Sequence, residues 1–125
     1  NKETTTMLTA CNAPFYRLTA GEKEYKLKLT TATKIEVEDR IGCSLLEALD
    51  KLAYTKVFAV TLWGALQKYQ ANMTLPKTYE LIDALEAEGF TLEDRADTFL
   101  GIMKVSGFFT PEQIADMERE EQEIE

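Results

Sequence analysis

The sequence predicts a mainly α-helical protein with about six helices and one β-hairpin at its N-terminal end. Two patterns lead to this fold class: residues 24–29 alternate strictly, as a strand does, and helix-capping residues then recur to the end of the chain. The third observation is size, because 125 residues with 45% hydrophobic content suit one compact domain. We expect residues 1–14 to form a flexible arm and residues 15–125 a single helical domain.

A β-hairpin is the first element that the sequence predicts. In its second strand Tyr25, Leu27 and Leu29 alternate with charged residues, which is the period of a half-buried strand. Residues 15–19 supply the first strand, and Gly21 in the connection can adopt the positive φ of a tight turn. Because two strands alone are marginally stable in water, we expect their apolar face to lie on helices.

Residues 30–41 carry signals of both a strand and a helix. The stretch Lys34–Glu38 alternates and contains β-branched residues, as strands do. Thr30 or Thr31, however, can cap the start of a helix, and Gly42 is well placed just after its end. We predict a helix here, and a third strand at this position would contradict that prediction.

Two helices are predicted in the middle of the chain. Ser44 and Glu47 have the spacing of a capping box, which opens a short helix to about Leu52. Residues 55–70 are apolar on nearly all sides of a helix, so we expect the central helix there, with Trp63 buried at its middle. On that basis Trp63→Ala is expected to cost about 3–5 kcal/mol. The predicted core residues are Phe58, Leu62, Trp63, Leu66, Phe99 and Leu100.

Three further helices follow, each with its own start or stop signal. Pro76 suits a first helical turn, and Gly89 suits the position just after the end of that helix. Thr91 begins the next helix, whose apolar residues follow helical spacing until Gly107 ends it. Thr110 opens a final acidic helix, because a proline follows it and a glutamine stands three positions further on.

Two glycines lie inside predicted helices, where glycine usually weakens the structure. Gly64 and Gly101 each cost about 1 kcal/mol there relative to alanine. Close crossing of neighbouring helices is the expected reason for both, which is a packing role.

The composition excludes several classes of function. The formal net charge of −8 and the pI near 4.6 argue against binding nucleic acid, which needs clustered Lys and Arg. The chain has no histidine, which removes histidine bases and histidine metal ligands. Its carboxylate pairs lie on predicted solvated faces, its glycines form no phosphate-binding motif, and no apolar run is long enough for a membrane span. We therefore predict a protein that is not an enzyme, with no cofactor, no metal, no nucleic-acid partner and no membrane partner.

The two cysteines favour a reducing compartment. Cys11 and Cys43 lie 32 positions apart and outside any CxxC pair, so we expect two unpaired thiols, with one disulfide as the alternative. Residues 1–7 supply no apolar region for a secretion signal. These features predict a cytoplasmic protein.

Charge is divided unevenly along the chain. Residues 1–68 contain 10 Lys and Arg against 8 Asp and Glu, whereas residues 69–125 contain 4 against 14. The final acidic helix is therefore either a solvated face or a segment that attracts a basic or aggregation-prone partner. Its thin apolar stripe and its seven mutually repelling acids predict weak docking on the rest of the domain.

The predicted partner-binding residues lie in and just before this acidic helix. Phe108 and Phe109 stand in the connection that precedes it, where they either fill the core or anchor a partner. Ile114 and Met117 form the apolar side of the helix. A helix that swings away would expose a groove floored by one of the two phenylalanines.

Four stretches between residues 15 and 105 carry a likeness to one known family. The first is the hairpin, with Gly21 and Tyr25-x-Leu27-x-Leu29. Residues 35–45 are similar to the family's E-x-x-x-G-x-S-L stretch, and residues 62–66 (Leu-Trp-Gly-Ala-Leu) to its L-W-x-A-L helix. The fourth stretch is residues 79–85, in a helix that ends at Gly89. In these features the chain resembles the phage tail assembly chaperones, including those of prophages and gene-transfer agents.

The resemblance implies a helical protein of the bacterial host cytoplasm that acts before the phage tail is complete. It implies that the chain binds the long, hydrophobic tape measure protein and contacts the major tail protein, recruiting its subunits around the tape. It also implies absence from the finished virion and carries over no catalytic residue. The first thirteen residues have no counterpart in the family.

Two other classes of function are weighed against this one. An acidic host-directed regulatory protein or nucleic-acid mimic is the alternative, but mimicry needs carboxylates across the whole surface, and residues 1–68 are near neutral. An enzyme of unknown type is the third class, and no motif supports it. A neighbouring gene of tape-measure length would favour the chaperone.

Overall fold

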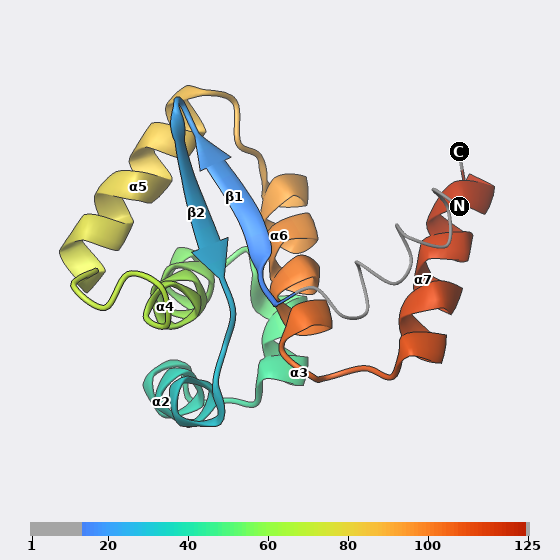
Figure 1. Ribbon diagram of the computed structural model, residues 1–125. Coiled ribbons are helices and arrows are strands. Elements are labelled where there is room, and N and C mark those ends of the chain that lie inside the picture. Colours follow the sequence, from blue (N-terminus) through green and yellow to red (C-terminus); the bar gives the residue numbers. More distant parts are fainter. Residues whose placement is uncertain (1–13, 125) are drawn as a thin grey trace.

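The computed structural model describes residues 14–124, with side chains described as far as residue 120. Within that range the chain forms six α-helices and a two-stranded antiparallel hairpin, as the sequence predicts (Figure 1). The predicted arm falls almost wholly outside the described residues, as does Cys11. Cys43 is half-buried and its thiol is free. No helix of the described part is long and apolar enough to cross a membrane.

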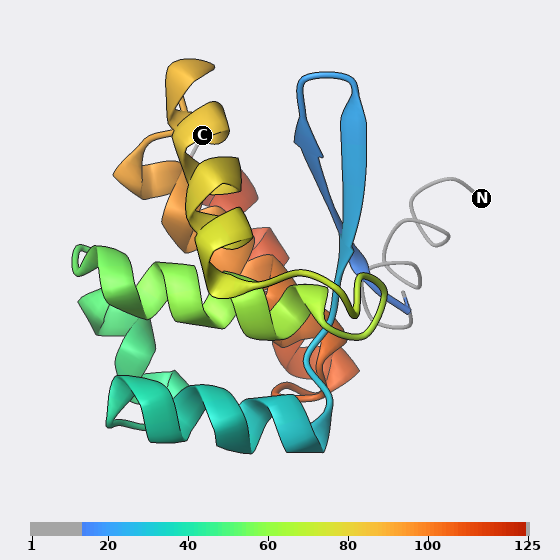
Figure 2. The same cartoon turned by 90° about the vertical axis from the view of Figure 1, so that its left-hand side faces the viewer.

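The hairpin consists of β1 (Tyr16–Ala20) and β2 (Lys23–Leu27), joined by a turn in which Gly21 has a φ of 62°. It lies against α4, α5 and α6, and Figure 2 shows it standing beside α5. β2 ends two residues earlier than predicted, because the next two amides bond to helices instead of to β1. The Lys28 amide donates to the carbonyl of Ala65 (3.0 Å), and the Leu29 amide donates to Ser106 Oγ (2.9 Å).

Residues 31–41 are a helix, so the prediction made between conflicting signals is confirmed. α2 (Thr31–Ile41) is capped by Thr30, whose side chain accepts from the Thr33 amide while Thr33 Oγ1 accepts from the Thr30 amide. Gly42 ends the helix in the left-handed conformation, with φ 78° and ψ 17°. Local capping therefore outweighs the two-residue alternation of this segment.

The central helix is α4 (Thr55–Leu66), reached through α3 (Leu45–Ala48) and the short 3₁₀ helix η1 (Leu49–Lys51). It contacts α2, α5, α6 and β2, which explains why nearly all of its faces are apolar. It ends before the predicted Gln70, because the side chain of Gln67 donates to the Trp63 carbonyl (3.1 Å) and to the Met73 carbonyl (2.9 Å). The Gln67 side chain thus occupies the Trp63 carbonyl, which would accept from a backbone amide if the helix continued.

The last three helices are α5 (Leu75–Ala87), α6 (Leu92–Val105) and α7 (Pro111–Ile124). The last two begin at the capping residues that the sequence predicts, and α5 has Pro76 in its first turn as predicted, with Thr74 as its cap. Gly89 and Gly107 follow α5 and α6 with φ of 96° and 87°, which suits glycine at a helix end.

The core centres on α4 and α6, and most of its predicted members are confirmed. Phe58, Leu62, Leu66 and Phe99 are all 0% exposed. Two predictions are wrong in degree, because Trp63 and Leu100 are each only half-buried. The outer face of Trp63 is covered by the Arg40 guanidinium, 4.7 Å from the ring centroid. Leu100 lies beside the α6 face that Phe99, Ile102 and Met103 bury.

The two glycines inside helices, Gly64 in α4 and Gly101 in α6, lie where neighbouring side chains come very close to the helix backbone. A Cβ at Gly64 would overlap Val37 of α2 and lie 3.3 Å from Leu29 Cδ2, so the predicted close crossing of helices is confirmed there. At Gly101 the prediction names the wrong neighbour. A Cβ there would overlap the ring of Tyr16, which belongs to a strand and not to a helix.

Candidate functional site

The predicted partner-binding residues lie together around the start of α7, but they do not form an exposed aromatic anchor. Phe108 and Phe109 are both half-buried and pack against the core. The Lys34 ammonium lies over the Phe108 ring, 4.6 Å from its centroid. Ile114 is 2% exposed and Met117 is half-buried. Packing against the core fits the first of the two roles predicted for the phenylalanines, and their role in partner binding stays a prediction.

α7 presents an acidic ridge to solvent. Its start is fixed by a reciprocal pair of bonds, in which the Thr110 amide donates to Gln113 Oε1 (2.9 Å) and the Gln113 amide donates to Thr110 Oγ1 (3.1 Å). Glu112, Asp116 and Glu120 are exposed and follow one another at intervals of four residues, so they share one face of the helix. We call these three residues the acidic ridge.

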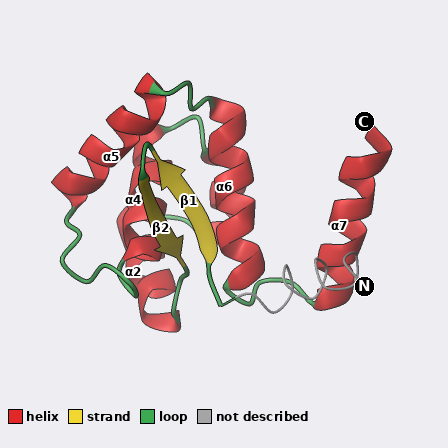
Figure 3. Cartoon of the chain, turned by 45° about the horizontal axis from the view of Figure 1, so that its top comes forward, coloured by secondary structure: helices red, strands yellow, loops and turns green. Residues whose placement is uncertain are grey.

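α7 stands at the edge of the molecule, on the far side of α6 from the hairpin (Figures 1 and 3). Lys104 on α6 and Glu118 on α7 form an ion pair across this boundary, with 3.9 Å between Nζ and Oε1. The Lys104 and Glu118 side chains are 16% and 29% exposed, so this pair is only partly open to solvent. Ile114 is the one fully buried side chain among residues 111–120.

The residues of the E-x-x-x-G-x-S-L stretch meet at the joint between α2 and α3. Glu38 Oε2 accepts from the amide of Leu45 (2.9 Å), and Gly42 provides the left-handed turn between the two helices. Ser44 Oγ accepts from the Glu47 amide (3.1 Å) and caps α3. The residues of this stretch thus form the turn that joins α2 to α3. Glu38 caps α3 by accepting from the amide of Leu45, seven residues further along the chain.

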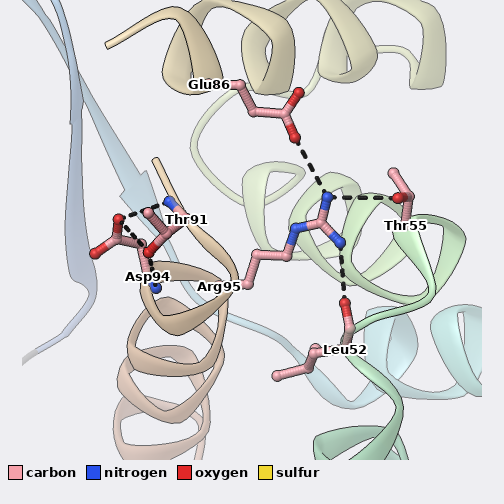
Figure 4. A network of polar contacts seen from close by, with 6 residues as sticks. All are labelled: Leu52, Thr55, Glu86, Thr91, Asp94 and Arg95. Atoms are coloured by element: carbon pink, nitrogen blue, oxygen red, sulfur yellow. Dashed lines mark hydrogen bonds and ion pairs between the residues drawn. The ribbon is translucent and has the colours of Figure 1, made fainter. Parts of the chain in front are cut away.

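Arg95 joins three helices through one guanidinium group (Figure 4). It donates to the Leu52 carbonyl (3.0 Å), to Thr55 Oγ1 (3.4 Å) and to Glu86 Oε2 (3.3 Å), and its guanidinium carbon lies 5.6 Å from the Phe58 ring centroid. The Arg95 side chain is 11% exposed, so this charge is largely removed from water and held by its three acceptors. The network fixes α4, α5 and α6 to one another.

The carboxylates nearest to this network have separate structural partners and do not converge. Glu86 pairs with Arg95, whereas Glu88 accepts from the Gly21 amide in the hairpin turn (3.0 Å). Asp94 caps α6 by accepting from the Thr91 amide (2.8 Å). No group of three or more metal-ligating side chains occurs within the described residues.

Among the side chains that the structure describes, Tyr16 is the one whose pKa is clearly perturbed. Burial is the main cause and raises the pKa of its hydroxyl above 10.0; a hydrogen bond with Thr98 opposes this shift, while Asp97 and Asp94 add to it. The ring packs against Gly101, so this burial belongs to the contact between the hairpin and α6.

A cluster of cations and aromatic rings that the sequence pattern does not predict lies on the outward face of the hairpin. The Phe15 and Tyr69 rings meet edge to face, with 5.5 Å between centroids. Arg17 and Lys26 lie 5.0 and 4.9 Å from the Phe15 centroid, and Lys68 lies 5.8 Å from the Tyr69 centroid. We call these five residues the hairpin patch. The alternation of the strands places Arg17 and Lys26 outward, but only the fold brings Lys68 and Tyr69 beside them.

Large apolar side chains are also exposed on four helices and at the residue that precedes α4. Their exposed fractions range from 49 to 68%, and single exposed residues of this kind are normal on a protein surface. They are Ile35, Leu46, Tyr54, Tyr79 and Leu92.

Comparisons of this chain with protein-family models, with curated proteins and with solved structures found no match.

Proposed function

We propose that this chain is a phage or prophage tail assembly chaperone, which binds the tape measure protein and helps to recruit the major tail protein. It acts in the cytoplasm of the bacterial host by binding and not by catalysis. The observation that carries the proposal is the joint between α2 and α3. Glu38, Gly42 and Ser44, which are spaced as in the chaperone stretch, all act there on the same turn of the chain. The resemblance therefore concerns a folded unit and not composition alone.

The arrangement of α7 suits the holding of an aggregation-prone partner. A tape measure protein is long and helical, and its apolar faces need cover before assembly. An amphipathic helix with an acidic outer side can cover such a face and at the same time keep the complex soluble. α7 has this form, because Ile114 and Met117 lie opposite its acidic ridge. Ile114 is buried in the free chain and becomes available to a partner when the weakly docked helix opens. The charge of the chain is concentrated there, which favours this role over that of a nucleic-acid mimic with carboxylates on all sides.

Co-expression with the neighbouring gene of tape-measure length tests the proposal. The soluble fraction of the tape measure protein is measured with the intact chain, with a chain ending at Gly107, and with no chain. We expect the intact chain to raise that fraction severalfold and the shortened chain to raise it less. Circular dichroism and thermal unfolding of the shortened chain show whether its body is folded.

The three samples separate the possible roles of α7. If both chains rescue the partner equally, the binding surface lies outside α7. If the partner is equally insoluble in all three samples, the chaperone proposal fails. Co-purification of the major tail protein with the complex tests the second half of the proposal.

A further inference from the structure

The apolar side of α7 is covered without being part of the core. Ile114 is 2% exposed and Met117 is half-buried. Among the described residues, neither belongs to the hydrophobic core, and Met117 is not one of the partly buried side chains that pack against it. Phe109 directly precedes the cap of α7, a position from which a side chain can cover one side of Ile114. The other sides of the isoleucine need a further cover.

The described chain begins close to the connection that leads to α7. Tyr16, at the start of β1, packs against Gly101 of α6. The same end of the hairpin leads to Leu29, whose amide donates to Ser106, directly after α6. Figure 1 shows this end of the hairpin beside the end of α6, from which the chain runs on to α7. Residues 1–13 therefore join the described chain near the connection between α6 and α7.

We call residues 1–13 the N-terminal segment, and its length and composition suit the apolar side of α7. An extended chain of thirteen residues spans about 40 Å, whereas a helix of 14 residues, such as α7, is about 21 Å long. Met7 and Leu8 are the large apolar residues of the segment. Its charged residues, Lys2 and Glu3, cancel, so the segment brings no net negative charge to an acidic helix.

We propose that the N-terminal segment covers the apolar side of α7 in the same copy of the chain, with Met7 and Leu8 on Ile114 and Met117. The length of the segment and the place where it joins the described chain identify it as the occupant. Such a short tether keeps the segment at a high effective concentration near α7, which a second copy or a separate protein does not have. The segment is then not the flexible arm that the sequence predicts.

This contact gives the free chain a closed state. The N-terminal segment and a helical partner compete for the same side of α7, so a partner must displace the segment before it binds. The competition rests on the proposed function, whereas the contact rests only on this chain and can be measured without a partner. A failure of the contact therefore leaves the proposed function untouched, and the reverse also holds.

Hydrogen exchange of the α7 amides tests whether the N-terminal segment covers this helix. One variant begins at Pro14, and a second keeps the full chain but carries Met7→Ser with Leu8→Ser. The matched control is Thr4→Ser with Thr5→Ser, which changes two side chains of the same segment and leaves its large apolar residues in place. Exchange of the α4 amides shows whether the body of each variant stays folded.

Both variants are expected to exchange the α7 amides at least about tenfold faster than the native chain, because each uncovers apolar side chains. The control should exchange like the native chain, and the α4 amides should not change in any of them. Protection of α7 in the native chain should not depend on protein concentration. If either variant exchanges α7 like the native chain, the proposal is wrong. Protection that falls on dilution would mean that a second copy supplies the cover, which also overturns it.

A photo-cross-linker on Cys11 tests the location of the segment directly. In a Cys43→Ser variant Cys11 is the single thiol, and benzophenone maleimide attached to it reacts on irradiation with C–H bonds that lie close by. A mixture of unlabelled and ¹⁵N-labelled protein distinguishes links within one copy from links between copies. We expect links from Cys11 to residues 111–120 within one copy. Links confined to other elements, or found only between copies, overturn the proposal.

Discussion

Gly101 and Tyr16 determine how closely the hairpin approaches α6. Alanine favours a helix over glycine by about 1 kcal/mol, so propensity alone would make Gly101→Ala stabilising. The added Cβ would instead overlap the Tyr16 ring. We expect Gly101→Ala to lower the free energy of unfolding by about 1–3 kcal/mol, measured by urea denaturation.

A double-mutant cycle isolates this contact. In a Tyr16→Leu background the added methyl group has more room, so Gly101→Ala is expected to cost less there than in the native chain. Equal costs in the two backgrounds would show that the overlap with Tyr16 is not the cause.

Phe58 and Trp63 test the effect of burial within one helix. Phe58 is 0% exposed, and Phe58→Ala is expected to cost about 3–5 kcal/mol. Trp63 has the larger side chain, but it is only half-buried beneath Arg40. We therefore expect Trp63→Ala to cost less than Phe58→Ala, and less than the about 3–5 kcal/mol expected for a fully buried tryptophan. Denaturation midpoints of the two variants show which substitution costs more stability. A greater loss for Trp63→Ala would mean that burial does not determine the cost at these two positions.

At the scale of elements, the starts of the helices could be predicted because the signals are local. Thr30, Thr91 and Thr110 each cap a helix through bonds to residues only three positions away. The end of β2 could not be predicted, because a distant partner sets it. The Leu29 amide bonds to Ser106, 77 positions away, and no local pattern contains that information.

The same distinction applies to the candidate sites. The acidic ridge follows from helical spacing and could be predicted once α7 was placed. The hairpin patch needs Lys68 and Tyr69 at the end of α4 beside Phe15, and the Arg95 network needs three helices in register. Both depend on tertiary packing, which composition and periodicity do not contain.

α7 is expected to open more readily than the other helices. Ile114 is the one fully buried side chain of α7 within residues 111–120, and the ion pair with Lys104 is long, at 3.9 Å. Amides of α7 should therefore exchange with solvent at least about 100-fold faster than those of α4. Ile114→Ala should raise the exchange rate of α7 more than Lys104→Gln does. Protection of α7 equal to that of α4 would contradict weak docking.

At the scale of the whole molecule, the uneven charge opposes the compact state. Residues 69–125 carry 14 acidic against 4 basic side chains, and several of the acids lie on the exposed faces of α5 and α7. Mutual repulsion of this kind destabilises a folded chain, and dissolved salt screens it over about 10 Å at 0.1 M. The ion pairs of the described residues include exposed ones that contribute little, so their screening offsets only part of the gain.

Salt is therefore expected to stabilise this protein. Raising NaCl from about 0.02 to about 0.5 M should raise the melting temperature by about 2–5 °C, because the repulsion is largely screened at the higher concentration. Chloride is used, since sulfate would strengthen apolar burial by itself. In a Glu112→Gln and Glu120→Gln variant the repulsion is already reduced, and the rise should be smaller. A melting temperature that falls with NaCl would mean that favourable ion pairs outweigh the repulsion among the acids of the C-terminal half.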